Sequence, residues 1–172
     1  LDATGTAILT LAQLDGGSFD GCGPVGLSGL TKTIFTCDDI GANPGIGMTV
    51  TDGSGNTTTC TAIITVHDTV APVAVCQNIT VNLDGAGNAT IVGSDLDGGS
   101  TDGCGAPALF TASKTSFTCA DIGTNNVMLT VTDNNGNVDS CMAIVTIADT
   151  VVPTATCQPI NAYLNAFGTV TI

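Results

Sequence analysis

The sequence contains no arginine, no glutamate and no tryptophan, and its only lysines are Lys32 and Lys114. Fifteen acidic residues, all of them aspartate, give the 172-residue chain a formal net charge of −13. A field of this sign repels nucleic-acid phosphates and anionic membrane surfaces. We therefore expect neither to be a partner.

Long apolar runs are also missing, since no segment reaches the roughly 18 residues that a membrane-spanning helix needs. No signal peptide is recognisable, and the chain starts at Leu1 without a methionine, which indicates a processed product or a window cut from a longer protein. Helix-forming residues are scarce, whereas threonine, valine, isoleucine, glycine and asparagine are abundant. This composition predicts strands joined by tight turns.

The chain contains two tandem copies of one sequence unit. Residues 15–23 (DGGSFDGCG) return as 97–105 (DGGSTDGCG), an offset of 82, and residues 68–72 return as 149–153, an offset of 81. The register therefore slips by one residue, which is missing from the second copy of residues 41–49. Self-similarity at a fixed period indicates a modular array.

Cysteine is abundant by contrast, with eight residues, four in each period. A unit of about 80 residues lies near the lower limit at which a hydrophobic core alone stabilises a fold. The cysteines show no Cys-x-x-Cys spacing and the single histidine is His67, so disulfides are indicated rather than zinc. Disulfides imply an oxidising, extracytoplasmic setting.

Side chains in residues 141–147 alternate between two faces, which is the periodicity of a strand. Residues 127–132 are expected to form the preceding strand, and residues 133–137 the hairpin loop between them. An opening strand is expected over residues 73–83, with a switch between sheets near Gln77. The pattern predicts an all-β fold of tandem immunoglobulin-like β-sandwich modules, stapled by disulfides.

The linkers set the expected topology. If the chain enters and leaves each elongated unit at opposite ends, the first and last strands run in the same direction and lie side by side. The expected disulfides then join cysteines of the same unit: Cys22 with Cys37, Cys76 with Cys141, and Cys104 with Cys119. On the loop-entropy model the largest loop contributes about 4 kcal/mol and each smaller loop about 3 kcal/mol.

Cys60 and Cys157 have no partner in this scheme. The chain is therefore interpreted as a window on a longer array. Residues 1–67 are a β-sandwich repeat that lacks its first strand, residues 68–148 are a complete repeat, and residues 149–172 are the opening strands of a third.

Strand donation between separate chains is the rival interpretation. It is disfavoured because residues 164–172 repeat the register of residues 1–9, so a donated tail would bring a segment that the recipient already has. The expected partners are neighbouring repeats of the same chain, with lateral or end-to-end self-association in a fibre.

Three motifs carry a family resemblance: Asp-x-x-x-Pro-x-x-x-Cys at residues 68–76, Asp-Gly-Cys-Gly at 102–105, and Thr-Val-Thr-Asp-x-x-Gly-Asn-x-x-x-Cys at 130–141. They resemble hyalin-type repeats, especially those strung in tandem along large cell-surface proteins of Bacteroidota, including a gliding-motility adhesin. The resemblance covers both units. It implies an immunoglobulin-like β-sandwich in an extracellular adhesive or structural protein of the cell surface, exported by type IX secretion.

A shorter resemblance lies in the linkers. Residues 68–70 and 149–151 are both Asp-Thr-Val, which resembles the Asp-Ser/Thr-aliphatic motif at which Bacteroidota O-glycosylate exported proteins. The resemblance implies a glycoprotein with Thr69 and Thr150 as the acceptors. The alternative is a plain extended linker before a proline.

Aspartates gather on elements that the topology brings to the end where the chain enters the complete unit. Carboxylates on converging loops suit Ca²⁺, a hard cation with six to eight oxygen ligands. The candidate ligands are Asp68, Asp95, Asp97, Asp102 and Asp133. Their counterparts in the first unit are Asp15, Asp20 and Asp52. The alternative is that these aspartates only form turns.

No catalytic constellation is recognisable, and His67 is replaced by Ala148 at the matching position of the second unit. We therefore do not expect this protein to be an enzyme. The expected function is a structural repeat of an extracellular surface fibre, stalk or adhesin, which provides length, stiffness and protease resistance. The alternative is a ligand- or carbohydrate-binding module of a secreted adhesin or enzyme. Similarity of the units favours the structural repeat, because a dedicated site would make one unit depart from the common plan.

Overall fold

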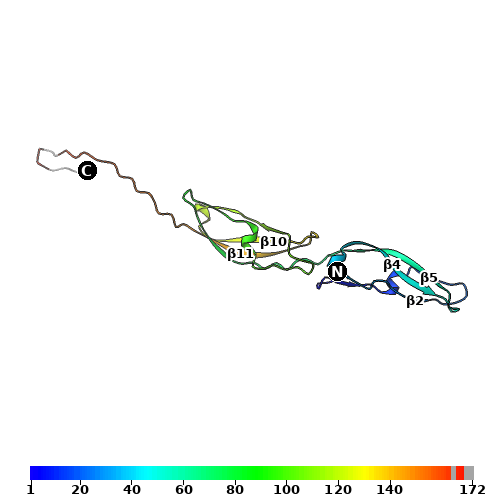
Figure 1. Cartoon of the computed structure of the whole chain (residues 1–172). Helices are drawn as coiled ribbons and strands as arrows, with labels where there is room; N and C mark the ends of the chain where they lie inside the picture. The colour runs from blue at the N-terminus through cyan, green and yellow to red at the C-terminus, as the bar shows by residue number, and fades with distance from the viewer. Residues whose placement is uncertain (164–165, 169–172) are drawn as a thin grey trace.

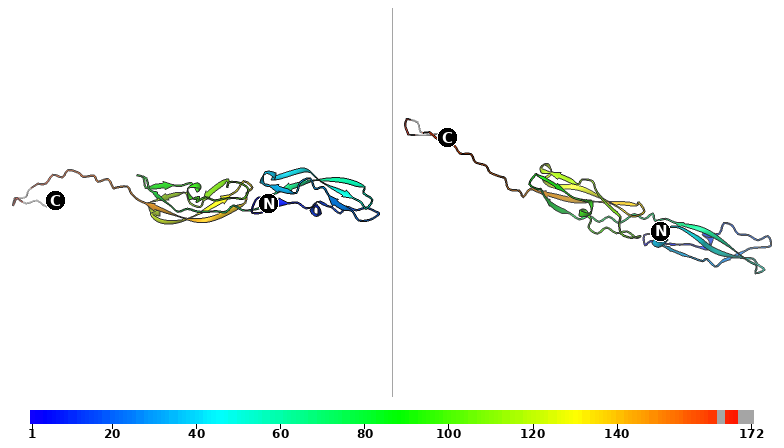
Figure 2. Two further views of the ribbon diagram at one scale, coloured as in Figure 1. Left: turned by 60° about the horizontal axis from the view of Figure 1, so that its bottom comes forward. Right: turned by 45° about the horizontal axis from the view of Figure 1, so that its top comes forward.

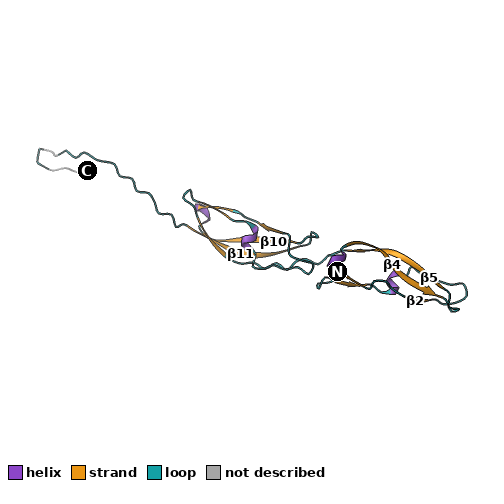
Figure 3. Cartoon of the chain, in the orientation of Figure 1, coloured by secondary structure: helices purple, strands orange, loops and turns teal. Residues whose placement is uncertain are grey.

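The computed structural model describes residues 1–163 and 166–168. Strands predominate, and Figure 1 shows two elongated β units placed end to end and followed by an extended tail. We call residues 1–67 the first unit, 68–148 the second unit and 149–163 the tail. In Figures 2 and 3 the strands run along the long axis of both units. The fold is all-β, and within its described part no helix is long and apolar enough to cross a membrane.

The second unit contains two sheets. Its strands are β6 (Ile79–Asn82), β7 (Asn88–Thr90), β8 (Leu109–Ala112), β9 (Ser116–Thr118), β10 (Gly123–Thr132) and β11 (Val138–Ala148), with the short 3-10 helices η2 (Gly93–Leu96) and η3 (Cys119–Asp121). The larger sheet has the order β6-β11-β10-β8. In it β6 and β11 are parallel and the other pairs antiparallel. The smaller sheet pairs β7 with β9.

One apolar cluster fills the second unit and draws on both sheets. Phe117 of β9, Leu129 of β10 and Val145 of β11 are among its fully buried members. Alternate residues of β10 and β11 face this core, as strand geometry requires. Each such side chain contributes about 1.5–3 kcal/mol by its burial. Paired strands over residues 127–132 and 141–147 are therefore confirmed.

The first strand of the second unit changes sheets along its length. Val73 and Thr101 exchange two backbone hydrogen bonds, and Cys76 forms a bridge to the same loop. Beyond Gln77 the chain crosses to the larger sheet and continues as β6 beside β11. The expected switch near Gln77 is present, although regular strand geometry covers only β6 rather than the whole of residues 73–83.

A disulfide joins the first and last segments of the second unit. Cys76 and Cys141 are bonded, with their Cα atoms 5.8 Å apart and 65 residues between them in sequence. This is the pairing expected from parallel first and last strands. A loop of that length stabilises by about 4 kcal/mol on the loop-entropy model.

The first unit follows the same plan without one strand. Its elements are β1 (Thr6–Ile8), α1 (Leu11–Leu14), β2 (Gly26–Ser28), β3 (Ile34–Thr36), the 3-10 helix η1 (Cys37–Asp39), β4 (Gly41–Thr51) and β5 (Thr57–Val66). β1 pairs with β3, and the other sheet has the order β2-β4-β5. Among the described strands none lies beside β5 as β6 lies beside β11. The extra residue of this unit makes a bulge in β4 at Gly45, whose φ is +75°.

The missing strand leaves the first unit's core open. Ala143 and Val145 on β11 are 0% exposed, whereas their equivalents on β5, Ala62 and Ile64, are only half-buried. Cys60 on β5 is exposed. Because the two units share one sequence plan, this difference in burial reflects the neighbour that β5 lacks.

Aspartate closes the tight hairpins. The Asp52 carboxylate accepts hydrogen bonds from the backbone N–H groups of Ser54 and Asn56, both at 2.8 Å. Asp84 and Asp133 accept the same pair of bonds from residues two and four positions later. Such Asx turns require a short side chain. The geometry gives a physical reason for using aspartate here in preference to glutamate.

These hydrogen bonds make the fold sensitive to acid. The side chain and backbone of Thr4 and the backbone of Thr6 bond the Asp2 carboxylate and lower its pKa to about 2. Hydrogen bonds from the side chain and backbone of Asn56 likewise lower the pKa of Asp52. A carboxyl whose pKa is lowered in the folded state stabilises the fold above its unfolded pKa, and this contribution disappears as pH falls through the folded pKa.

We predict that the melting temperature in 0.15 M salt stays level from pH 7 to about 5 and falls as pH drops from about 4 towards 2. The competing effect is relief of the repulsion that a net charge of −13 causes in the folded chain. Salt screens this repulsion beyond about 8 Å. Circular dichroism melting curves at each pH measure the outcome. A melting temperature that rises on acidification would mean that charge repulsion outweighs the turn hydrogen bonds.

Candidate functional site

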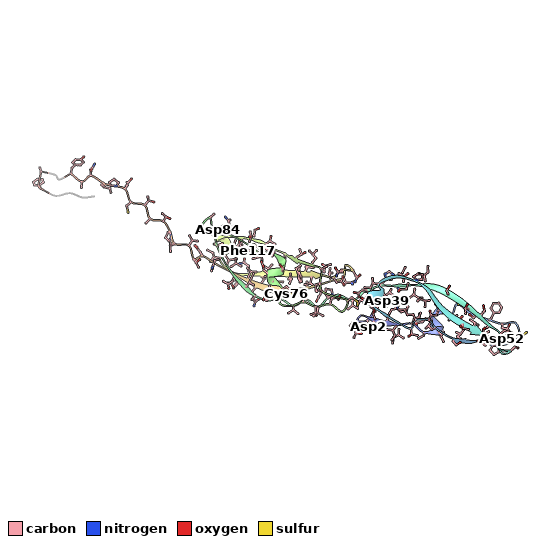
Figure 4. All side chains as sticks on the ribbon, in the orientation of Figure 1. Asp2, Asp39, Asp52, Cys76, Asp84 and Phe117 are labelled. Atoms are coloured by element: carbon pink, nitrogen blue, oxygen red, sulfur yellow. A yellow bond between two sulfur atoms is a disulfide. The ribbon has the colours of Figure 1, made fainter. Side chains whose placement is uncertain are left out.

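The junction between the two units is the candidate functional site. We call the end of a unit that carries its Asp52 or Asp133 hairpin the leading end, and the end where its last strand finishes the trailing end. In Figure 4, Asp2 and Asp39 lie at the trailing end of the first unit, which faces the second unit, and Asp52 lies at its leading end. Asp84 lies at the trailing end of the second unit.

A disulfide crosses this junction. Cys37, at the trailing end of the first unit, is bonded to Cys104, in a leading-end loop of the second unit, with the Cα atoms 5.2 Å apart. The expected bridges between Cys22 and Cys37 and between Cys104 and Cys119 are therefore wrong. Cys22 and Cys119 are unpaired and exposed in the structure.

Strand direction explains why the intra-unit bridges do not form. Between Cys104 and Cys119 the chain runs through β8 and β9, which carry it from the leading end to the trailing end. The same path through β2 and β3 separates Cys22 from Cys37. Fifteen residues in extended form span up to about 50 Å, so cysteines close in sequence lie at opposite ends of a unit.

Two glycines allow the units to approach. A Cβ atom at Gly5 would lie 2.5 Å from the Cys37 sulfur and 2.8 Å from the Gly103 carbonyl oxygen. A Cβ atom at Gly103 would lie 2.9 Å from the Ala3 carbonyl oxygen. All three distances are shorter than real Cβ atoms show. The contact beneath the disulfide is therefore a close packing of backbone on backbone, which only glycine permits.

Three carboxylates converge beside the disulfide. Each of Asp68, Asp102 and Asp133 offers an oxygen, and these oxygens lie within 4.8 Å of one another. Asp68 comes from the linker, Asp102 from the loop that carries Cys104, and Asp133 from the hairpin after β10. The convergence expected for these three residues is present at the leading end of the second unit.

Asp95 and Asp97 do not join this cluster, contrary to expectation. The Asp95 carboxylate accepts a hydrogen bond from the backbone N–H of Val92, before η2. The Asp97 carboxylate accepts bonds from the backbone and the hydroxyl of Ser100. These two aspartates form local turns, as the alternative interpretation proposed.

Hydrogen bonding within the cluster leaves one carboxylate oxygen free. Asp68 accepts from the side chain of Asn135 at 3.0 Å, and Asp102 Oδ2 accepts from the backbone N–H of Cys104 at 2.9 Å. Asp102 Oδ1 is buried and has no partner among the described residues. Burial raises the pKa of Asp133, but the hydrogen bonds from Asn137 and neighbouring backbone groups outweigh it and hold that pKa below its usual value.

The donor set fits a hard cation. Asp133 stays ionised at neutral pH, and clustered carboxylates that are partly removed from water repel one another unless a cation or protons compensate. Three carboxylates with water would supply the oxygen ligands that Ca²⁺ accepts. Of the residues expected to form a counterpart in the first unit, Asp20 and Asp52 occupy the positions of Asp102 and Asp133, but no described residue there takes the place of Asp68.

The implied O-glycosylation residues are accessible. Thr69 and Thr150 are both exposed, at equivalent positions of the two linkers. Asp68 beside Thr69 is buried in the acidic cluster, whereas Asp149 beside Thr150 is exposed. The two linkers therefore present the same motif in different surroundings.

Comparison with protein-family models and with curated proteins finds no match to this chain. The function is therefore argued from the junction itself. Two disulfides support an oxidising, extracellular or secreted environment.

We predict that removing Ca²⁺ with a chelator lowers the melting temperature, because an ion bound only by the folded state stabilises it by mass action. At a free Ca²⁺ concentration of 100 times its dissociation constant, the bound ion stabilises the folded state by about 2.7 kcal/mol. Differential scanning calorimetry measures the shift. Asp102→Asn should abolish it, while Asp20→Asn, the matched change in the first unit, should leave it intact. An unchanged melting curve in excess chelator would reduce the cluster to turn-forming aspartates.

Proposed function

We propose that this chain is a structural repeat of an extracellular surface fibre, stalk or adhesin, with immunoglobulin-like β-sandwich units that provide length, stiffness and protease resistance. The two packed sheets of the second unit support this fold assignment. The linear arrangement of units in Figure 1 supports a role in spanning distance. Calcium at the acidic cluster and glycans on Thr69 and Thr150 would reinforce the linkers.

The disulfide between Cys37 and Cys104 carries the proposal. It joins two units that the chain already connects through Asp68 and its neighbours, so the junction is held at two points. Two covalent attachments restrict bending far more than one flexible linker does. A stalk needs such a restriction, whereas a binding module can work on a single linker.

The second disulfide gives a load path through the unit. Tension applied to the linkers enters near Cys76 and leaves beyond Cys141, and these two residues are bonded. The chain between them is bypassed and cannot be drawn out while the bond is intact. Once that bond is reduced, the parallel pairing of β6 with β11 places the terminal strands in shear, which requires many hydrogen bonds to break together.

Protease resistance is supported by the surroundings of the two lysines. Lys32 binds Asp39 and lies over the ring of Phe35, with 5.0 Å between Nζ and the ring centre. Lys114 makes the equivalent contacts with Asp121 and the ring of Phe117. Cleavage at either lysine requires local unfolding, which these contacts and the bridges oppose.

Single-molecule force spectroscopy tests the proposal, with handles attached through non-natural side chains at Thr69 and Thr150. We predict that the oxidised protein gives no unfolding step in the second unit. Reduction should release the 65-residue separation between Cys76 and Cys141, a gain of up to about 220 Å at roughly 3.4 Å per residue. Cys76→Ser/Cys104→Ser, which also removes the bond from Cys104 to Cys37, should show this gain without reductant, and Cys22→Ser, which removes an unpaired cysteine, should behave like wild type.

Full lengthening of the oxidised wild-type protein at low force would contradict the load-bearing role. The binding-module alternative would then be the better account of the fold.

A further inference from the structure

The larger sheet of the second unit has an exposed outer surface. Alternate residues of β10 and β11 point into the core, so the residues between them point outwards. The edge strands β6 and β8 alternate in the same way, and Thr80 and Thr111 are exposed. We call this surface the sheet face. It consists of residues 80 and 82 of β6, residues 109 and 111 of β8, and the even-numbered residues of β10 and β11.

The sheet face carries no charged residue, although the chain has a net charge of −13. Among the described strands only β11 contains an aspartate, Asp139, which shares the phase of the core-facing residues. Its carboxylate accepts a hydrogen bond from the backbone N–H of Ala74 at 2.9 Å. The equivalent outward residues on β4 and β5 of the first unit are also uncharged. The charge of the chain therefore lies away from these faces.

Apolar side chains gather on the sheet face of the second unit. Met128 on β10 lies directly opposite Met142 on β11, and Ile144 is the next outward residue along β11. These three side chains are 42%, 60% and 40% exposed, respectively. Nearer the leading end, the exposed side chains of Leu109 and Val138 lie on either side of the same β10 residue. A connected apolar patch without charged residues is typical of an interaction surface.

The fold itself does not require this patch. Gly47 and Thr61 lie opposite each other in the first unit, where the second unit has Met128 and Met142. Both units form the same pair of long strands with these different residues. The methionines are therefore better explained by a contact that the sheet face makes than by the stability of the sheet.

The charge pattern limits what can cover the sheet face. A basic partner would be attracted to the aspartates at the ends of the units and not to an uncharged surface. A sugar-binding surface uses aromatic rings for stacking, and the sheet face has none. Two copies of this chain repel each other through their aspartates. This repulsion is smallest when they meet through uncharged faces, so a second copy fits the surface best.

We propose that two copies of this chain associate side by side, with the sheet face of one second unit packed against the sheet face of the other. Sheets that pack face to face lie about 10 Å apart with interdigitating side chains. Met128, Met142 and Ile144 of both copies would then be buried. The proposal rests on the proposed function as a fibre or stalk, and it adds the surface through which neighbouring fibres associate.

Contact through one pair of units is weak because the sheet face is small. Strands lie about 4.8 Å apart and rise about 3.3 Å per residue, and β6 and β8 are short, so the face covers roughly 450 Å². A standard stable interface buries about 800 Å² on each partner. One pair of units therefore associates reversibly, whereas many pairs along two arrays act together.

Sedimentation equilibrium of the whole chain tests the proposal. The four unpaired cysteines are first alkylated without reduction, so that no disulfide can form between copies. We expect a reversible equilibrium between monomer and dimer. Its dissociation constant should fall as salt is raised from about 0.05 M to about 0.5 M, because salt screens the repulsion between the two acidic chains. An association held by ion pairs would weaken instead, which would contradict the proposal.

Substitutions at Met142 locate the contact. Met142→Asp should raise the dissociation constant by about tenfold or more, because it brings a charge into an apolar contact. Met142→Thr introduces the residue of the first unit and should have a smaller effect in the same direction. Val92→Asp is the matched control, since Val92 is 59% exposed but lies outside the larger sheet, at the N-cap of η2 where aspartate is favourable. It should leave the dissociation constant unchanged.

The methionine methyl groups provide a second measurement that needs no variant. The chain has three methionines, and Met48 is buried in the first unit with 2% of its surface exposed. In a chain with isotope-labelled methionine methyl groups, dilution should shift the NMR signals of Met128 and Met142 and leave that of Met48 in place.

Three results would overturn the proposal. They are a chain that stays monomeric at every concentration and salt, an association that persists in Met142→Asp, and methyl signals of Met128 and Met142 that do not change on dilution. Loss of the dimer in excess chelator would also overturn it, because the contact would then run through aspartates that share a cation. The force response of a single chain does not depend on this contact, so failure here is distinguishable from failure of the proposed function.

Discussion

The disulfide between Cys37 and Cys104 is the constraint on which the rest of this structure depends. It requires each unit to carry one cysteine at its leading end and one at its trailing end. It also requires glycine at positions 5 and 103, because the backbones approach more closely than a Cβ atom allows. The acidic cluster of Asp68, Asp102 and Asp133 lies beside it and joins the linker to the same loop. Covalent, steric and electrostatic features of the junction thus serve one interface.

Much of the fold within one unit could be predicted from the sequence. Alternation over residues 141–147 and turn residues at 133–137 are local signals, and the bridge between Cys76 and Cys141 followed from the direction of the linkers. The bridge across the junction could not be found by pairing cysteines that are near in sequence. The required signal was strand direction: the loop of Cys104 was already expected at the leading end, and β9 carries Cys119 to the other end.

The acidic site was predicted in part for a related reason. Asp68, Asp102 and Asp133 converge because topology brings their three elements to one end of the unit. Asp97 lies on the loop that the first strand pairs with, but Ser100 binds its carboxylate locally. Sequence spacing does not reveal which aspartates are used by their own turns. Only the hydrogen bonds in the structure distinguish the aspartates of the cluster from those that form local turns.

The central claim is that neighbouring units are bonded to each other, and a disulfide map of the monomer tests it most directly. The denatured, alkylated and unreduced chain is cut before aspartates and at Lys32 and Lys114. These cuts separate Cys22 from Cys37 and Cys104 from Cys119. The account predicts a peptide containing Cys37 linked to one containing Cys104. Links from Cys22 to Cys37 and from Cys104 to Cys119 would contradict it.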